Sequence, residues 1–313
     1  MSKGKSPINV NELIKQNNKN RKFTNMKEKI IPIVLFLIAS TSFLTTIGIV
    51  YILLYESFNF FQEVSFVEFF TGTVLKPMSQ QPEFGILPLL VGTLTATGIA
   101  LAVAVPIGLL SAIYLSEYAP KKIRDIVKPT IEILAGIPTI VYGFFAFTFV
   151  TPLLQEVFPE LEATNILSPG LVMGIMIIPM IASLSEDAMN AVPQSLREGA
   201  LGLGSSKIEV TCKVVIPAAL SGIIASIVLA LSRAIGETMI VTIASGSSKN
   251  LTFDIMTSMQ TMTAYIVEVT GGDAPAGSTI YYSLYAVALT LFVFTLLMNV
   301  LANYTAEKLQ QKY

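Results

Sequence analysis

Arg233 and Glu237 are the two charged residues of a segment, residues 216–246, that is otherwise uncharged. A charge at the centre of a membrane helix costs about 2.5 to 3.5 kcal/mol on insertion scales, so such charges are kept where they face the interior of a helix bundle. A spacing of four residues places both on one face of a helix, and we predict that they pair when no ligand is bound. A structural ion pair that clamps two helices is the alternative.

The chemistry of Arg233 favours a pathway for an oxyanion over such a clamp. A planar guanidinium donates two parallel hydrogen bonds to a tetrahedral oxyanion and keeps its charge. Glu237 would hold the arginine when the anion is absent and could accept a hydrogen bond from a protonated anion oxygen. Binding has to be weak, because a tight site would trap the ion.

The composition indicates that a membrane protein must position these two residues. The chain has 313 residues, of which 53% are hydrophobic and only 13% charged, against about 25% charged in soluble domains. Zero histidines exclude His-based metal sites, His proton relays and Ser-His catalysis, and a single cysteine excludes an internal disulfide. We therefore expect a membrane protein and not a soluble enzyme, with membrane lipid around it, no metal site and no nucleic-acid partner.

Six apolar segments predict an all-α, polytopic membrane protein with six transmembrane helices, since about 20 residues cross a bilayer as a helix. The first 29 residues are polar and basic, and the span after them is too long for a cleavable signal, so it should remain as an anchor. The expected spans are 30–55, 86–116, 130–152, 168–185, 217–245 and 279–304. The expected regions are an N-terminal arm at 1–29, a first helix with an outer loop at 30–85, a core at 86–304 and a tail at 305–313.

The positions of lysine and arginine predict the orientation. Seventeen of the twenty lie in the N-terminal arm, the 118–129 loop, the 186–216 loop and the C-terminal tail, while Lys76 and Lys249 fall on the opposite side and Arg233 within a span. By the positive-inside rule both termini and both basic loops are cytoplasmic, in the cell membrane. Glu132, near the basic end of the third span, is predicted to pair with Lys128 or to lie at the interface.

The long loop between the fourth and fifth spans predicts two short helices joined by a turn. Pro193 suits a first helical position, and glycines at 202 and 204 should end this first helix. Ser205 or Ser206 can cap a second helix that ends near Pro217. The apolar face of the first helix would consist of Leu196, Ala200 and Leu203. Such a hairpin could rest on the membrane surface or bind a soluble partner.

The loop also resembles the EAA loop of ABC importer permeases. Glu198, Ala200 and Gly204, followed after nine residues by "VVIP" at 214–217, keep the spacing of that pattern, with conservative departures at Gly199, Val214 and Ile216. The resemblance implies a coupling helix that sits in a groove of a separate ATPase subunit. The residues it assigns to ATPase coupling are Glu198, Ala200, Gly204, Ser205, Lys207 and Pro217.

Two further stretches, 114–145 and 231–246, resemble the permeases of phosphate importers of the PstC type, and the resemblance covers about 85–304. It implies a type I ABC importer permease fold and inorganic phosphate as cargo. The implied partners are a second permease subunit of the PstA type, two copies of an ATPase subunit and an extracytoplasmic phosphate-binding protein. Residues 1–29 and 56–83 carry no motif.

ATP chemistry is expected on the partner, because this chain has no G-x-x-x-x-G-K-[ST] loop; the nearest text, "GALGLGSSK", lacks a lysine directly after its second glycine. No cofactor is expected in this chain, and ATP and Mg would be bound by the ATPase. Two alternatives stay open. One is the same architecture carrying sulfate or molybdate, and the other is a secondary transporter, which paired broken helices and inverted repeats would favour.

Overall fold

A computed structural model of the chain describes residues 10–272 and 274–309. Six of its helical segments are long and apolar enough to cross a membrane, which confirms the predicted number of spans. The six segments are Ile30–Glu63, Leu87–Tyr118, Thr139–Val157, Leu167–Asn190, Lys207–Ile235 and Thr279–Tyr304. The chain divides into two compact units, residues 1–55 and 56–313.

The first unit contains most of α1, a helix of 54 residues that runs Val10–Glu63 and ends in the second unit. Pro32 lies inside the helix without ending it. The predicted boundary between an arm and a first span, at residue 29, is not marked by a break, because α1 continues through it. Apolar side chains of this unit, such as Phe36 and Phe43, are exposed, as expected for a helix that lipid surrounds.

The second unit carries the remaining elements in three groups. The first group is α2 Phe66–Thr71, β1 Leu75–Lys76, β2 Glu83–Phe84, α3 Leu87–Ile113 and the π-helical turn η1 Tyr114–Tyr118. The second is α4 Lys121–Ala135, α5 Thr139–Phe145, η2 Ala146–Val150, α6 Thr151–Val157 and α7 Leu167–Asn190. The third is α8 Gln194–Gly202, α9 Lys207–Val210, η3 Thr211–Val215, α10 Ile216–Ile235, α11 Met239–Ala244, α12 Met262–Gly271 and α13 Thr279–Leu309.

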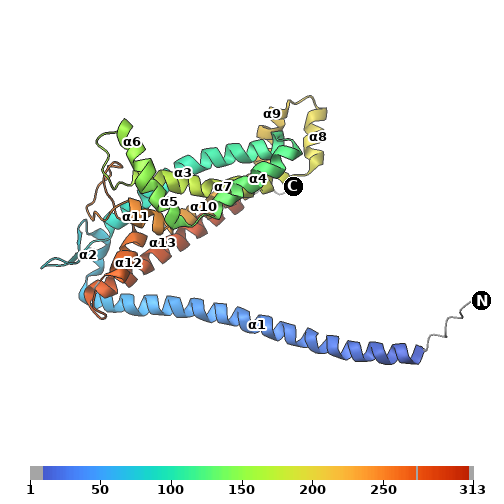
Figure 1. Cartoon of the computed structure of the whole chain (residues 1–313), viewed down its shortest axis with the longest axis horizontal. Helices are drawn as coiled ribbons and strands as arrows, with labels where there is room; N and C mark the ends of the chain where they lie inside the picture. Colours follow the sequence, from blue (N-terminus) through green and yellow to red (C-terminus); the bar gives the residue numbers. More distant parts are fainter. Residues whose placement is uncertain (1–9, 273, 310–313) are drawn as a thin grey trace, which may run out of the picture. The chain divides into compact units, whose positions relative to one another are not determined.

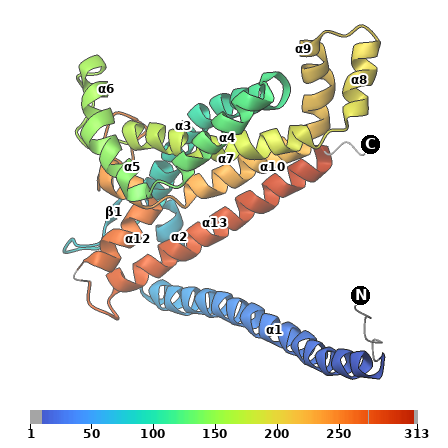
Figure 2. The ribbon, with the colours of Figure 1, turned by 45° about the vertical axis from the view of Figure 1, so that its right-hand side comes forward.

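Helices α3, α7, α10 and α13 form the bundle of the second unit. Helix α7 packs against α3 and α10, and α10 packs against α13. Small residues permit the closest approach: a Cβ added at Gly174 of α7 would lie 2.9 Å from the carbonyl oxygen of Ala100 on α3. Figures 1 and 2 show α8 and α9 at one end of this bundle, and α2, α12 and β1 at the other. We call the latter end, with the segment 245–261, the hairpin end.

The third span differs from the prediction of 130–152. Residues 121–135 form a separate helix, α4, and the span begins at Thr139. Pro138 explains the break, because it lacks an N–H and disfavours helical backbone at the residue before it. Helix α4 packs against α7, and its charged side chains lie near the end of that helix.

Two π-helical turns lead into helices that carry proline near their first residue. Turn η2 precedes Pro152 of α6, and η3 precedes Pro217 of α10. A proline in an α-helix clashes with the carbonyl four residues earlier, and the wider turn relieves this clash. The predicted end of a helix near Pro217 is thus wrong: the fifth span continues from Lys207 through Pro217 to Ile235.

The fifth span also ends earlier than the predicted 217–245. Helix α10 ends at Ile235, Gly236 follows it, and α11 begins at Met239. The irregular segment after α11 runs over residues 245–261, and its last residues, Met259 to Thr261, are buried together with the first turn of α12. Backbone without helical bonds is tolerated at membrane depth where protein or water satisfies it. The break leaves Arg233 on α10 and Glu237 in the connection between α10 and α11.

Candidate functional site

The loop between α7 and α10 has the predicted helix, turn and helix. Helix α8 begins after Pro193, which is its N-cap and not its first residue. Gly204 adopts φ +89°, a conformation that glycine reaches without strain. Ser206 and Glu209 form a capping box that starts α9, with the Ser206 N–H donating to Glu209 Oε2 at 3.0 Å. Local sequence thus fixes both the turn and the start of the second helix.

The residues predicted to couple to an ATPase do not all lie on one surface. Glu198 and Gly204 are exposed, while Ala200 is half-buried against the apolar cluster around Val210 and Val215. Leu203 was predicted on the inner face of α8, but it follows the last helical residue and is 90% exposed. With Leu201, it presents an apolar tip at the turn, a feature that marks interaction surfaces.

Of the other predicted coupling residues, Ser205 and Pro217 are half-buried, while Lys207 is exposed. Ser205 is half-buried and its N–H donates to the Ala200 carbonyl at 3.2 Å. Lys207 extends over the ring of Tyr118 on η1, with Nζ 4.9 Å from the ring centroid. Pro217 lies in the first turn of α10. Ser205, Lys207 and Pro217 therefore shape the loop and its attachment.

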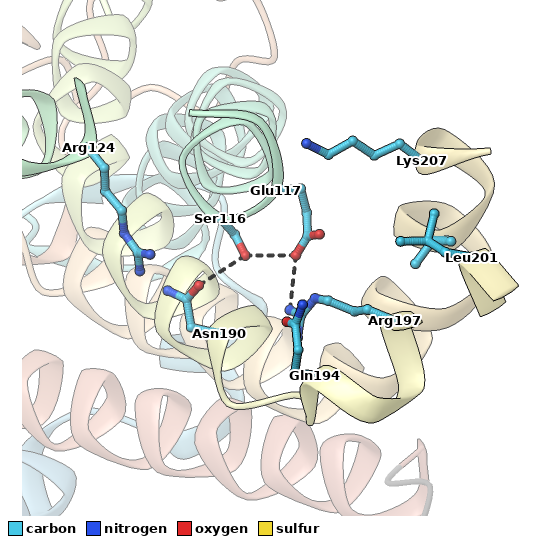
Figure 3. Close-up of a pocket in the computed structure, with 9 residues that line it drawn as sticks. Ser116, Glu117, Arg124, Asn190, Gln194, Arg197, Leu201 and Lys207 are labelled. Atoms are coloured by element: carbon cyan, nitrogen blue, oxygen red, sulfur yellow. Dashed lines mark hydrogen bonds and ion pairs between the residues drawn. The ribbon is translucent and has the colours of Figure 1, made fainter. Parts of the chain in front are cut away.

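A cleft of about 550 Å³ separates the loop from the ends of α3 and α7 (Figure 3). Arg197 of α8 crosses it, and Nη2 lies 3.0 Å from Oε1 of Glu117 on η1. Both side chains are largely buried, Arg197 at 13% and Glu117 at 8% exposed. The same guanidinium donates to the carbonyl oxygens of Met189 at 2.7 Å and Val192 at 2.5 Å. Arg197 thus ties α8 to both α3 and α7.

A second group of charges continues from this junction to α4. Asn190 of α7 links the two groups: its Oδ1 lies 3.3 Å from Ser116 Oγ, and its Nδ2 donates to Glu186 Oε1 at 2.6 Å. Glu186 is fully buried and forms ion pairs with Arg124 and Lys128 of α4. A buried carboxylate requires such partners, because leaving a charge unpaired away from water is costly.

The predicted pair of Lys128 with Glu132 is wrong. Lys128 contacts Glu186 at 2.5 Å and Asp187 at 2.7 Å, and Glu132 accepts a hydrogen bond from Ser183 at 3.1 Å. Both residues project from α4 toward α7, where Lys128 finds two carboxylates and Glu132 a serine hydroxyl. Burial opposes the charge of Lys128, but its hydrogen bonds to Asp187 and Glu186 and their charges outweigh this and raise its pKa.

Arg233 lies in the last turn of α10, and its side chain is exposed within the span. Its one polar contact among the described residues is from Nη2 to the Sδ of Met176 on α7, at 3.9 Å. A thioether is a weak acceptor, so most of the donors of the guanidinium are available to a ligand. The end of a helix favours a cation there.

Glu237 has a different environment from the predicted one. It is 8% exposed, and its Oε1 accepts hydrogen bonds from the N–H groups of Met239 at 3.1 Å and Ile240 at 3.4 Å. No ion pair joins it to Arg233 in the part of the chain that the structure describes. The predicted pairing is wrong because the spacing of four residues applies only within one helix, and α10 ends between them.

The roles of Arg197, Glu117, Glu186 and Asn190 were not predicted from the sequence. Arg197 counted there only as one positive charge of a loop, and Glu117 lies in another segment. One signal was present: Arg197 directly precedes Glu198, so a helix that exposes Glu198 turns its neighbour toward a different side. The partners come from segments far apart in the sequence, and only the fold brings them together.

Comparisons with known proteins agree with this architecture. Residues 104–311 match the family described as "Binding-protein-dependent transport system inner membrane component". The chain is 34% identical over 264 residues to the phosphate transport system permease protein PstC of Mesorhizobium japonicum, covering 78% of this chain and 79% of the relative. It is 36% identical over 253 residues to that of Haemophilus influenzae, covering 74% and 78%.

A crystal structure of a bacterial ABC transporter involved in the import of the acidic polysaccharide alginate has a similar fold, with a TM-score of 0.63 at 16% identity, over 93% of this chain and 100% of that one. A structure of the MetNI methionine ABC transporter gives a TM-score of 0.54 at 15% identity, over 72% and 95%. These likenesses show the type I ABC importer permease fold. The chain therefore belongs to the family of binding-protein-dependent transport system inner membrane components, the permease subunits of ABC importers.

Proposed function

We propose that this permease carries inorganic phosphate, and that Arg233 is the residue that contacts the anion in the membrane. The observation that carries the proposal is the state of its guanidinium: it is exposed inside an apolar span, and its one polar contact within the described part of the chain is the weak one to Met176. Relatives named as phosphate transport permeases support the choice of cargo. An arginine without a carboxylate partner can donate two parallel hydrogen bonds to phosphate oxygens.

Glu237 then has a supporting role in place of the predicted clamp. Its carboxylate holds the first N–H groups of α11, and its carbonyl oxygen accepts from Thr263 Oγ1 at 2.7 Å. These bonds fix the break that follows Gly236. A fixed break keeps the last turn of α10, and with it Arg233, at a constant position.

The loop between α7 and α10, which carries α8 and α9 and is called the α8–α9 loop below, is proposed to dock on a separate ATPase subunit. Glu198 has no polar partner among the described residues, and Leu203 and Leu201 form an exposed apolar tip beside it. A charged group beside an apolar anchor is typical of a protein interface. Arg197 would pass movement of the docked loop to α3 and α7, since it bonds to groups at the ends of both.

The α8–α9 end is proposed to face the cytoplasm, with both termini on that side. The described basic residues of the loops around α4, α8 and α9 support this orientation, because positive charge is retained inside. The hairpin end would then face a substrate-binding protein. A second permease subunit of the PstA type and two ATPase copies would complete the assembly.

Uptake of radiolabelled phosphate tests the cargo. Cells or proteoliposomes that depend on this chain and its partner subunits should take up phosphate with ATP, and unlabelled phosphate should compete while sulfate and molybdate at equal concentration should not. Lys213→Gln, an exposed change on the α8–α9 side, serves as the control and should leave uptake unchanged. If sulfate or molybdate inhibits the uptake as strongly as unlabelled phosphate does, the assignment of phosphate as the specific cargo is wrong and another oxyanion takes its place.

A further inference from the structure

Lys76 and Lys249 are the two exceptions to the charge distribution of the chain, and the structure brings them together. Both line one cleft of about 400 Å³ at the hairpin end. The polar groups of its lining residues are two ammonium groups, the hydroxyls of Ser79 and Ser247 and the amide of Asn250, and none of them is a carboxylate. All of these side chains can donate hydrogen bonds, which suits an anion.

Backbone interactions hold the two walls of the cleft in place. Val74 and Asn250 form an antiparallel bridge, which attaches the β1–β2 hairpin to the segment after α11. That segment is fixed in turn by the Gln260 N–H, which donates to the Ser248 carbonyl at 3.0 Å. Gly246 has φ +83°, and a Cβ there would lie 2.0 Å from Ser258 Oγ. The two lysines therefore extend from an ordered wall.

The charges of the two lysines are only partly compensated. Lys249 Nζ donates to Glu268 Oε1 at 2.8 Å, and Gln260 Nε2 donates to Glu268 Oε2. Lys76 lies opposite Glu83 in the hairpin register, but no ion pair involves it among the described residues. An ammonium is a compact point charge with three donors, so it can hold an anion without a rigid geometry.

Polar groups continue from the cleft to the carbonyl of Glu237 in the break after α10. Gln260 bonds to the cleft segment through its N–H, and its Oε1 is buried without a hydrogen-bond partner among the described residues. The hydroxyl oxygens of Thr261 and Thr263 lie 3.0 Å apart, and the Thr263 hydroxyl donates a hydrogen bond to the carbonyl of Glu237. Helix α11 joins Glu237 to the cleft segment and, at six residues, is only about 9 Å long. The break that positions Arg233 and the segment that lines the cleft are thus joined by one short helix.

We propose that this cleft is a first binding site for a small oxyanion before it reaches Arg233, with Lys76 and Lys249 as its charged ligands. The proposal rests on the proposed import of an oxyanion. Exposed carboxylates of Glu83, Glu162 and Asp254 at the same end would repel such a cargo, and two ammonium groups offset this locally. Partial pairing with Glu268 keeps the attraction weak enough for release.

A labelling experiment tests the cleft without relying on transport. Ser247→Cys is introduced on a Cys212→Ser background, and the assembled complex in nanodiscs reacts with a negatively charged thiosulfonate reagent and with an uncharged one. Inorganic phosphate should slow labelling by both reagents about two- to fivefold, the range that exposed ion pairs provide. Chloride at equal ionic strength should not. Lys76→Gln with Lys249→Gln should remove the protection, and the matched control Glu83→Gln should keep it.

Equal protection with and without the two lysines, or none with both present, would overturn the proposal. In a third outcome, phosphate does not slow labelling, and the double variant needs a higher half-saturating concentration of substrate-binding protein for ATPase stimulation. This result would also overturn the proposal, because it would assign the lysines to protein docking. Sulfate is tested beside phosphate. Slower labelling with either anion supports the proposed binding site in the cleft. If an anion slows labelling but the complex takes up no phosphate, the proposed function is wrong while the cleft site stands.

Discussion

Arg197 of α8 and Glu117 of η1, the turn that continues α3, form an ion pair of 3.0 Å across a cleft, and both side chains are largely buried. The same arginine also bonds to two carbonyl groups at the end of α7. An exposed loop that docks on another subunit is thus joined by one side chain to two helices of the bundle. This connection gives movement of the loop a direct route into the membrane helices.

Removal of this connection should uncouple ATP hydrolysis from transport. In Arg197→Ala, Glu117 is left buried without its partner, which costs about 3 to 5 kcal/mol of stability by analogy with other buried pairs. Glu117→Gln is milder, because the amide oxygen still accepts from Arg197. We expect both variants that assemble to retain ATPase attachment and hydrolysis, with less phosphate carried per ATP.

The control for this pair is Lys213→Ala, which breaks an exposed ion pair with Glu209 on the same side. Exposed pairs contribute about 0 to 1 kcal/mol, so this variant should behave like the parent chain. A double-mutant cycle of Arg197 and Glu117 should give a coupling energy of about 0.5 to 3 kcal/mol. An unchanged ratio of phosphate to ATP in a stably assembled Arg197→Ala would rule out a coupling role.

Gly204→Asp should weaken attachment of the ATPase while the permease still inserts. The change adds a side chain and a charge at the turn of the proposed docking loop, at a residue with φ +89°. Co-purification of the ATPase subunit in mild detergent measures the effect. Gly271→Asp is the control, since it adds the same group at an exposed glycine with equally open space, in α12 at the hairpin end and outside the proposed docking loop. Equal attachment in both variants and the parent would place docking elsewhere.

Glu186→Ala should destabilise the permease more than Asp187→Ala. Glu186 is fully buried and its loss would leave Arg124 and Lys128 facing each other without their shared carboxylate, whereas Asp187 is 59% exposed. The expected loss is about 3 kcal/mol for the first and below about 1 kcal/mol for the second. Thermal unfolding of the detergent-solubilised protein measures both. A larger loss in Asp187→Ala would contradict the assignment of Glu186 as the centre of this cluster.

The pKa of Lys128 gives the same cluster a pH dependence. Asp187 and Glu186 raise this pKa above its ordinary value of 10.5, despite partial burial. A group whose pKa is raised by folding contributes stability that is fully present below the unfolded pKa and is lost as pH rises through the folded one. The contribution of Lys128 should therefore be constant at neutral pH and fade only above about pH 10.5.

Cysteine labelling tests the orientation. On the Cys212→Ser background, Gln80→Cys and Glu160→Cys should react with an impermeant thiol reagent from outside, and Lys122→Cys should react only after permeabilisation. The reason is the excess of basic residues on the α4 and α8–α9 side. All three positions are exposed, and the parent Cys212 is exposed and has to be removed. Labelling of Lys122→Cys in sealed cells would reverse the orientation.

Parts of the structure that depend on local sequence could be predicted. Six spans follow from runs of apolar residues, and the α8–α9 turn follows from Gly204 and the Ser206 cap. The break after α10 was missed because Gly236 is compatible with a membrane helix, and the hydrogen bond that Thr263 of α12 donates to the Glu237 carbonyl in the break comes from a distant segment. The Arg197–Glu117 pair was missed because its partners belong to distant segments, which periodicity does not relate.

Variants of Glu237 should reflect its contacts with the N–H groups at the start of α11 and not a pairing with Arg233. As a cap of α11, Glu237→Gln keeps an oxygen that accepts from Met239 and Ile240 and should retain much of the uptake, while Glu237→Ala should lose more. Exchange of the two residues, Arg233→Glu with Glu237→Arg, should not restore assembly or uptake, because no ion pair joins them in the described chain. Recovery in the exchanged variant would restore the clamp as the explanation.

Phosphate uptake by Arg233→Gln, at matched amounts of assembled complex, tests the central role of this arginine most directly. Glutamine keeps hydrogen-bonding capacity but removes the positive charge, and we predict that uptake is lost while expression and subunit association stay near those of the parent. Arg233→Lys should recover only part of the uptake, because an ammonium has the charge without the paired donors. Normal uptake by Arg233→Gln would contradict the assignment of Arg233 to the anion pathway.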